Sequence, residues 1–373
     1  MKIPLSIYIH VPFCPAKCLY CDFLSHPGGE AVFDSYVAAL CNHIKTKAPL
    51  FAEYRVETIS FGGGTPTVLP TAHLSQILNA IKSEFDLADG ISITIEANPE
   101  TVDAAYLSNL HNMGVNRISF GVQSFDDKLL AAIGRIHTAE RAIQAIELAA
   151  KTGFNGINLD LMFALPHQTV TDFEKSLDFA ISLPITHISC YALTIEENTP
   201  LARRDDLLPT ICDEITDRKM YHLAAEKLAA AGFNHYEISN WAKPGHACRH
   251  NNGYWTHRQY IGFGTGAHSF MSNTRFRNTS NLIKYINGDF VPRETEKVDT
   301  QTAMSEYIFL GLRLTDGISA AHFKTRFATD IHTHFAKQLQ TLKNQGLIAI
   351  NVDNIRLTKK GLDLANTVFA EFI

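Results

Sequence analysis

The chain has 373 residues, of which 46% are hydrophobic and 19% are charged, and this composition excludes a disordered or fibrous protein. Lys and Arg number 33 and Asp and Glu number 38, so the net charge is −5. This balance argues against a nucleic-acid binder, whose affinity depends on clustered cations. No 18 apolar residues run together, so we predict no membrane-spanning helix and expect a cytoplasmic protein.

Six short segments within residues 5–191 have the length and the Ile, Val and aromatic content of strands. These predicted strands are residues 5–10, 58–61, 91–96, 117–120, 157–162 and 187–191. Between them, apolar residues at helical spacing predict helices over residues 33–44, 73–85, 104–111, 139–152 and 171–181. The alternation predicts an α/β fold with parallel pairing and helical crossovers. Both a doubly wound sheet and an incomplete (βα)6 barrel satisfy it.

The second part of the chain has a different pattern. A helix is predicted over residues 213–231 and a strand over 236–238, and residues 241–270 are rich in glycine and aromatic side chains with little periodicity. Further on, the predicted elements are helices 305–314 and 331–344, strands 347–351 and 354–357, and a final helix 357–369. We interpret these as a small α+β winged-helix-like domain, without the dense basic stripe that DNA binding needs. The expected division is 1–235, a connecting segment 236–299, and 300–373.

Three of the seven cysteines, Cys14, Cys18 and Cys21, form a CxxxCxxC pattern in the loop after the first predicted strand. Three thiolates on so short a loop can converge on one soft metal centre. A zinc ion would need a fourth ligand, which His10 or His26 could supply. A [4Fe–4S] cluster is normally held by four cysteines, so three would leave one iron open to a small molecule. The other cysteines are scattered as ordinary small core residues: Cys41, Cys190, Cys212 and Cys248.

Polar residues and glycines also follow the next predicted strands. They are Gly64 and Thr65 in GGGTP, Glu96 in EANP, Gln123 in GVQ, Arg135 in GRIH, and Asp160 near the end of the fifth strand. Consecutive glycines let a backbone approach a ligand closely and leave amides free as donors. A carboxylate at a strand end can accept hydrogen bonds from ribose hydroxyls or an ammonium group. Because the carboxyl ends of parallel strands share one edge, we expect one ligand site there.

The CxxxCxxC pattern with Tyr20 before its third cysteine resembles the radical S-adenosylmethionine (SAM) family, in which the open iron of a [4Fe–4S] cluster is chelated by SAM. More narrowly, YIHVPFC, FGGGTPT, EANP, GVQSF, GRIH, INLDLMFALP, ISCYALTIEENTP and YEISN resemble the oxygen-independent coproporphyrinogen III oxidases and their haem-chaperone relatives. The likeness runs from about residue 4 to 270 and continues more weakly beyond. It implies a partial (βα)6 barrel, a cluster on Cys14, Cys18 and Cys21, and a SAM site lined by Tyr8, Gly64, Thr65, Glu96, Gln123, Arg135 and Asp160.

Two features differ from the oxidases of this group. Phe23 stands where their motif, CxxxCxxCxC, has a fourth cysteine. The chain also begins 13 residues before Cys14, so we expect it to lack the longer N-terminal arm that the oxidases place over their substrate. Both departures resemble the haem chaperones of the group.

A third feature is the segment RHNNGYW, which resembles the HNxxYW motif of the chaperones. The resemblance implies that His250 is associated with haem, and a neutral imidazole is a common axial ligand of haem iron. Tyr254 and Trp255 offer flat surfaces for a porphyrin, and Arg249 and Arg258 offer charges for its propionates. The alternative is that His250 lies in an aromatic segment for packing reasons alone.

The leading hypothesis is therefore a radical-SAM-type haem chaperone that transfers haem to apo-haemoproteins, respiratory enzymes among them, with at most transient membrane docking. The alternative is a coproporphyrinogen III oxidase that forms protoporphyrinogen IX, an activity that Phe23 puts in doubt. A zinc-bearing structural protein is the third possibility.

Overall fold

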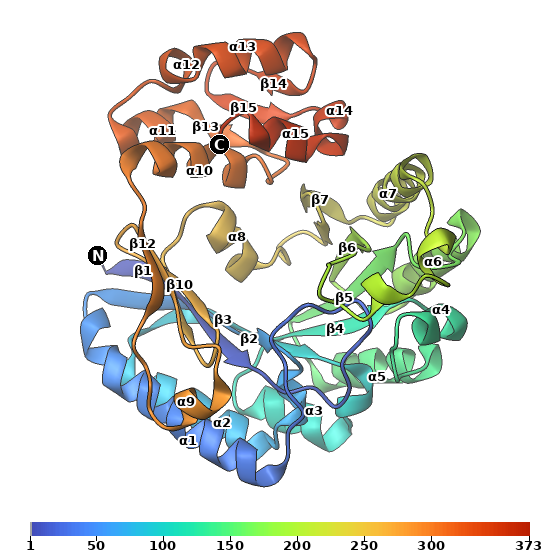
Figure 1. Ribbon diagram of the computed structural model, residues 1–373, viewed down its shortest axis with the longest axis vertical. Coiled ribbons are helices and arrows are strands. Elements are labelled where there is room, and N and C mark those ends of the chain that lie inside the picture. Colours follow the sequence, from blue (N-terminus) through green and yellow to red (C-terminus); the bar gives the residue numbers. More distant parts are fainter. Residues whose placement is uncertain (1) are drawn as a thin grey trace.

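The computed structural model describes residues 2–373, and its main element is one twelve-stranded, mostly parallel sheet with the order β12-β11-β10-β9-β1-β2-β3-β4-β5-β6-β8-β7 (Figure 1). The parallel strands are β1 (Ile3–Val11), β2 (Tyr54–Gly63), β3 (Leu87–Ala97), β4 (Arg117–Gln123), β5 (Gly156–Phe163) and β6 (His187–Ala192). Each of the six predicted strands lies within one of them. The added strands are β7 (Asn234–Glu237), β8 (Asn240–Ala242), β9 (Tyr260–Phe263), β10 (His268–Met271), β11 (Thr274–Arg277) and β12 (Arg293–Lys297).

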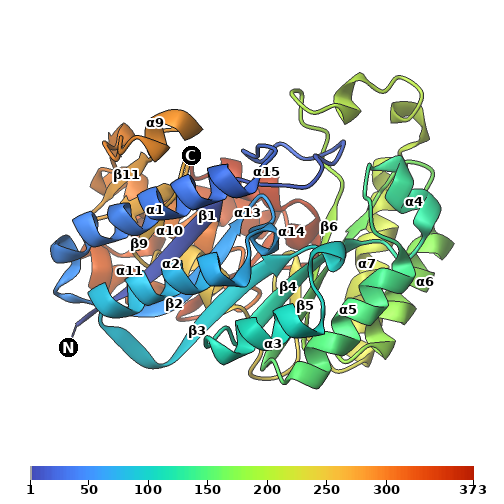
Figure 2. The same cartoon turned by 90° about the horizontal axis from the view of Figure 1, so that it is seen from below.

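Helices between the parallel strands cover one face of the sheet, and Figure 2 shows α1, α2, α3 and α5 side by side on that face. They are α1 (Glu30–Lys47), α2 (Thr71–Glu84), α3 (Ala104–Asn112), α4 (Asp127–Ala132), α5 (Ala139–Thr152), α6 (Val170–Ser182) and α7 (Glu214–Ala230). Local sequence explains their ends. Thr169 and Asp172 form a reciprocal capping box at the start of α6, and Gly153 ends α5 at a φ of 94°.

Strand order decides between the two folds that the sequence leaves open. A doubly wound sheet reverses its strand order at a switch point and has helices on both faces. Here β1 to β6 follow one another consecutively, each parallel to the next. The sheet does not close, because β1 pairs on its other side with β9 and β6 pairs with β8. The predicted partial (βα)6 barrel is therefore confirmed.

The strands that flank the barrel were largely missed in the sequence. β8 to β12 have three to five residues each, too short to display a period, and they come from the connecting segment, residues 236–299. The same segment holds the short helices α8 (Arg249–Trp255) and α9 (Leu282–Ile286). Helix α8 contacts β2 of the barrel and α10 of the C-terminal part, and Figure 1 shows it between them.

The C-terminal part has its own hydrophobic core, built around residues such as Ile308, Phe323 and Leu342. Its helices are α10 (Thr300–Gly311), α11 (Ala320–Phe327), α12 (Ile331–His334), α13 (Ala336–Asn344), α14 (Lys359–Asp363) and α15 (Ala365–Ala370). Its three-stranded sheet has the order β13 (Ile318–Ser319), β15 (Asn354–Leu357), β14 (Ile348–Ile350). The predicted hairpin is present, but two predicted helices are each broken in two, at Phe335 and Leu364, and α11 was missed. No helix within residues 2–373 has the length and apolar character to cross a membrane.

Candidate functional site

The loop that carries the three cysteines is fastened at both ends by backbone hydrogen bonds. Phe13 forms a parallel bridge with His26, and the amide of His26 donates to the carbonyl of Pro12 at 2.7 Å. At the far side of the loop, the amide of Leu19 donates to Ile133, and the carbonyl of Leu19 accepts from Leu201. The loop is thereby held across the carboxyl ends of the barrel strands instead of extending into solvent.

A cavity of about 370 Å³ lies between this loop and the strand ends. Its wall contains nine of the eleven predicted site residues: Cys14, Cys18, Cys21, Gly64, Thr65, Glu96, Gln123, Arg135 and Asp160. The structure thus brings together residues that are up to 146 positions apart, from Cys14 to Asp160. Most of them end or directly follow a strand of the same barrel, and Arg135 lies between helices α4 and α5. Tyr8 and His250 are outside this wall.

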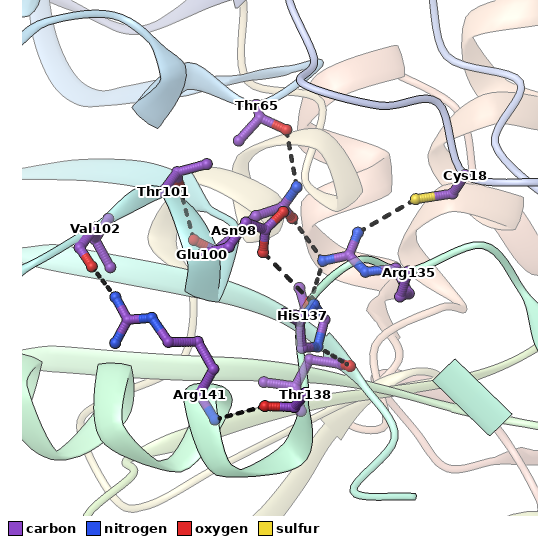
Figure 3. Close-up of polar contacts among 12 residues, drawn as sticks. Cys18, Thr65, Asn98, Glu100, Thr101, Val102, Arg135, His137, Thr138 and Arg141 are labelled. Carbon is purple, nitrogen blue, oxygen red and sulfur yellow. Dashed lines mark hydrogen bonds and ion pairs between the residues drawn. The ribbon is translucent and has the colours of Figure 1, made fainter. Parts of the chain in front are cut away.

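A chain of polar contacts connects Cys14 to Cys18 through the strand ends, and Figure 3 shows its part from Thr65 through Asn98 and Arg135 to Cys18. The Sγ of Cys14 lies 3.5 Å from Oγ1 of Thr65, which accepts from Nδ2 of Asn98 at 3.1 Å. Oδ1 of Asn98 accepts from Nη2 of Arg135 at 2.7 Å, and Nη1 of Arg135 donates to Sγ of Cys18 at 3.4 Å. Asn98 belongs to the EANP segment but was missed as a site residue, because the sequence shows no partner for its amide.

The other site residues that the sequence does not predict are polar side chains on strands β4, β6 and β8 and on helix α8. Ser119, Ser189, Tyr191, Asn240 and Asn251 all line the cavity. Alternation along β4 and β6 could have indicated the first three, since residues two apart on a strand share a face. No comparable signal existed for Asn240 and Asn251, which lie in β8 and α8.

Position 64 must be a glycine because of its contact with the cysteine loop, and not only because of a ligand. A Cβ on Gly64 would lie 2.5 Å from the carbonyl oxygen and 2.9 Å from the nitrogen of Phe13. The amide of Gly64 donates to Val11 at 2.8 Å and that of Thr65 donates to Phe13 at 2.7 Å. The glycine loop therefore packs backbone against backbone on the residues just before Cys14.

Glu96 and Asp160 extend into the cavity from β3 and β5. The Glu96 side chain is accessible from the cavity, yet protein encloses its carboxylate, and this burial together with the nearby Asp160 raises the pKa of Glu96 to about 7. Burial also raises the pKa of Asp160, although Asn158 donates to its Oδ1 at 2.7 Å. Two enclosed carboxyl groups near a polar wall are suited to accept hydrogen bonds from a cationic or hydroxyl-bearing ligand.

The raised pKa of Glu96 predicts a pH-dependent effect of its removal. An unfolded chain has a Glu pKa near 4.3, so the folded protein binds the extra proton and loses stability as pH rises from about 4.5 to about 7. We expect Glu96→Gln to raise the Tm of the ligand-free protein more at pH 8 than at pH 5, measured by calorimetry. Glu53→Gln, at an exposed position, is the control, and an equal Tm change at both pH values would contradict the assignment.

Tyr8 lines a second, neighbouring cavity, and its hydroxyl lies 3.1 Å from Nδ1 of His10. The two cavities share Phe23, Gly63 and Glu96 in their walls.

His250 lies on helix α8 and is only 3% exposed. Thr58 donates to Ser6, so its Oγ1 accepts from Nδ1 of His250 at 2.8 Å. Nε2 then accepts from the hydroxyl of Tyr254 at 2.9 Å. Burial, with a smaller contribution from Arg258, lowers the pKa of His250 to about 3, so the ring is neutral. Both ring nitrogens are engaged, and iron ligation by Nε2 would first require Tyr254 to release it.

The neighbours of His250 also differ from their expected roles. Arg258 and Arg249 both approach Glu57, at 3.3 and 3.7 Å, so each charge already has a carboxylate partner in the protein. Trp255 packs under the guanidinium of Arg313, whose Cζ lies 4.4 Å from the ring centroid. Of the two predicted aromatic surfaces, Tyr254 lines the second cavity, whereas Trp255 lines neither that cavity nor the cysteine-lined one.

Comparison with known proteins is consistent with this geometry. Residues 8–180 match the Radical SAM superfamily, and residues 298–364 match the HemN C-terminal domain. The fold superimposes on coproporphyrinogen III oxidase (HemN) of Escherichia coli, a radical SAM enzyme, with a TM-score of 0.89. That match covers 100% of this chain and 90% of the other at 22% identity, and it shows the fold. The barrel with its cysteine-lined cavity is therefore that of a radical SAM protein.

Sequence similarity identifies the family. The chain is 37% identical to the haem chaperone HemW of Bacillus subtilis (strain 168), with 99% of each chain covered. It is 35% identical to the haem chaperone HemW of Escherichia coli (strain K12), with 99% of this chain and 98% of the other covered. The chain belongs to the HemW family of radical SAM proteins.

Membership of the radical SAM superfamily implies a [4Fe–4S] cluster and SAM, and the cavity fits both. The three thiols at its edge are free of disulfides, and burial raises the pKa of Cys14 and Cys21, so both thiols lose protons when they bind metal. Nε of Arg135 and Oδ1 of Asn240 are buried at this site without a hydrogen-bond partner. Unpaired polar atoms beside a cavity are available to a polar ligand.

Proposed function

We propose that this protein is a haem chaperone that binds haem and transfers it to apo-haemoproteins. The observation that carries the proposal is similarity over the whole chain, including the C-terminal part, to proteins named haem chaperone HemW. Two sequence features of this chain support it: Phe23 in place of a fourth cysteine, and the HNxxYW segment of α8.

Within this proposal, Cys14, Cys18 and Cys21 hold the cluster, and three ligands leave one iron open. Bound there, the cluster supplies a coordination position for the amino-acid end of SAM and an electron for its cleavage. Gly64, Thr65, Glu96, Gln123, Arg135 and Asp160 line the SAM site, and Tyr8 contributes from the adjoining cavity. Arg135 and Asn98 orient the cysteine loop, because their hydrogen bonds connect it to β3 and β4.

Oxidation of coproporphyrinogen III is not favoured as the function. The fold is shared with HemN, but 22% identity carries the fold alone. Phe23 leaves the cysteine loop with three thiols where the oxidase motif has four, and its ring is 69% exposed between the two cavities.

The proposal extends to partners and location. Acceptors are apo-haemoproteins, respiratory enzymes among them, reached in the cytoplasm with at most transient docking at a membrane.

Residues 1–235 form the radical SAM unit, residues 236–299 the connecting segment with the HNxxYW motif, and residues 300–373 the C-terminal unit. The prediction that His250 itself ligates haem iron stays a prediction, since Tyr254 occupies its Nε2.

A haem titration tests the proposed function. The full chain, with its cluster reconstituted under anaerobic conditions, is titrated with haem and followed by difference absorbance in the Soret region. We expect saturation at about one haem per chain, since pockets that enclose a small molecule are few in a protein. An increase in absorbance that is linear in haem and never saturates would contradict the proposal.

A further inference from the structure

A second cavity of about 450 Å³ opens beside the cysteine-lined cavity. Strand β1, the end of the cysteine loop, helix α8 and strands β9 to β11 form its walls. It shares Phe23, Gly63 and Glu96 with the cysteine-lined cavity, so the two are neighbours rather than separate sites. The cysteine-lined cavity is the one proposed for the cluster and SAM, and apart from the contribution of Tyr8 the second cavity has no assigned role.

The side chains of the second cavity suit a flat, largely apolar molecule. Phe23, Leu24, Tyr254, Tyr260 and Ala267 supply apolar and aromatic surface. The rings of Tyr254 and Tyr260 meet edge to face, with centroids 4.8 Å apart, which fixes their orientation. Phe23 is 69% exposed, so its ring is free to be covered by a ligand in this cavity.

Two histidines line this cavity, and they differ in availability. His10 is buried, with Nδ1 at 3.1 Å from the Tyr8 hydroxyl and Nε2 at 3.2 Å from the Leu24 carbonyl, so both of its nitrogens are engaged. His268 on β10 is exposed, and its ring has no hydrogen bond to any residue in the range 2–373. Partial burial and the nearby Arg277 lower the pKa of His268, which favours the neutral ring that metals bind.

Arg277 lies opposite His268 in the register of β10 and β11 and also lines the cavity. One terminal nitrogen pairs with Glu294, while its Nε is buried without a hydrogen-bond partner. A guanidinium has five N–H donors, so it can bind a carboxylate in addition to Glu294.

We propose that haem binds in this second cavity, with His268 as its axial iron ligand, Arg277 on a propionate, and the ring against Phe23, Tyr254 and Tyr260. This inference rests on the proposed chaperone function and names its binding site. His250 then acts as a positioning residue. Its Nε2 accepts a hydrogen bond from the Tyr254 hydroxyl and thereby fixes the Tyr254 ring that faces the haem. Phe23 acquires a role as well, since the residue that replaces a fourth cysteine forms part of the porphyrin surface.

The test compares four variants with the wild type in Soret difference titrations of the reconstituted full chain. His268→Ala should shift the Soret maximum and weaken haem binding about ten-fold or more. Arg277→Gln should weaken binding about ten-fold without moving the maximum, because a charged hydrogen bond is lost but the ligand is kept. His250→Ala should weaken binding with the maximum unchanged. His332→Ala, an exposed histidine on α12, is the matched control and should behave as wild type.

Protoporphyrin IX, which has no iron, separates ligation from packing. His268→Ala should bind it as tightly as the wild type does, measured by quenching of tryptophan fluorescence, and this also shows that the variant is folded. Arg277→Gln should bind it more weakly. A wild-type Soret maximum and affinity in His268→Ala, with a shift in His250→Ala instead, would overturn the proposed site and assign the iron to α8. Absence of haem binding by the wild type would instead overturn the chaperone function itself.

Discussion

Replacing Cys18 with Ala should abolish the visible iron–sulfur absorption of the anaerobically reconstituted protein. Each cysteine of the loop is needed to anchor a separate iron, and three are already one fewer than usual. No other cysteine in residues 2–373 lines the cavity, so none can substitute for Cys18. The change also removes the acceptor of the Arg135 hydrogen bond that fastens the loop to β4. Iron and sulfide analysis of the purified protein provides the measurement.

The control is Cys41→Ser, since Cys41 lies on α1 within the outer helical layer and should leave cluster content unchanged. Cys14→Ala and Cys21→Ala should behave as Cys18→Ala does. A full complement of four irons in Cys18→Ala would show that the cluster has a ligand outside the CxxxCxxC segment.

The second large effect is expected for Gly64→Val. The sequence alone suggests that a branched side chain there blocks SAM and spares the cluster. The structure gives a broader expectation, because a Cβ on Gly64 meets the backbone of Phe13 at 2.5 Å, and backbone cannot move aside as a side chain can. The residue before Cys14 must then shift, so we expect loss of both cluster content and SAM affinity.

Iron content and equilibrium dialysis with SAM measure the two losses separately. Gly29→Val is the matched control at the end of the same loop, since a Cβ there meets no atom within 4 Å and the residue has an extended φ of −157°. Normal iron content with reduced SAM affinity in Gly64→Val would show instead that the side chain blocks SAM and spares the cluster.

The sequence predicts the barrel well, because its strands are long, apolar and separated by periodic helices. Strand β5 illustrates this, since all its residues are buried except Asp160, the one that faces the cavity. The same regularity explains why Glu96 and Asp160 line one cavity, because the topology carries the ends of parallel strands to one edge.

The other features of the site depend on contacts between segments that are distant in the sequence, and no local sequence pattern indicates such contacts. Asn98 matters because Thr65 and Arg135 converge on it, and His250 is enclosed because Thr58 and Tyr254 take its two nitrogens. Helix α8 was not predicted either, because Gly and Asn disfavour helices and only packing between β2 and α10 stabilises it. The second cavity has the same origin, since strands β9 to β11 that form it are too short to predict.

Phe23 and Glu96 lie in the walls of both cavities, so occupancy of one cavity changes the surroundings of the other. A haem against Phe23 would lie beside the SAM site, because Phe23 lines both cavities. A haem chaperone and a coproporphyrinogen III oxidase therefore differ in whether a tetrapyrrole in these cavities is carried or oxidised. This difference can be measured directly.

The central claim is that this radical SAM protein carries haem and does not oxidise coproporphyrinogen. The most direct test gives the reconstituted protein coproporphyrinogen III with SAM and dithionite under anaerobic conditions and follows the products by chromatography. We expect protoporphyrinogen IX to stay at the level of a sample without protein, while the same preparation binds haem with saturation. Formation of protoporphyrinogen IX above that background would contradict the account and assign the protein to the oxidases.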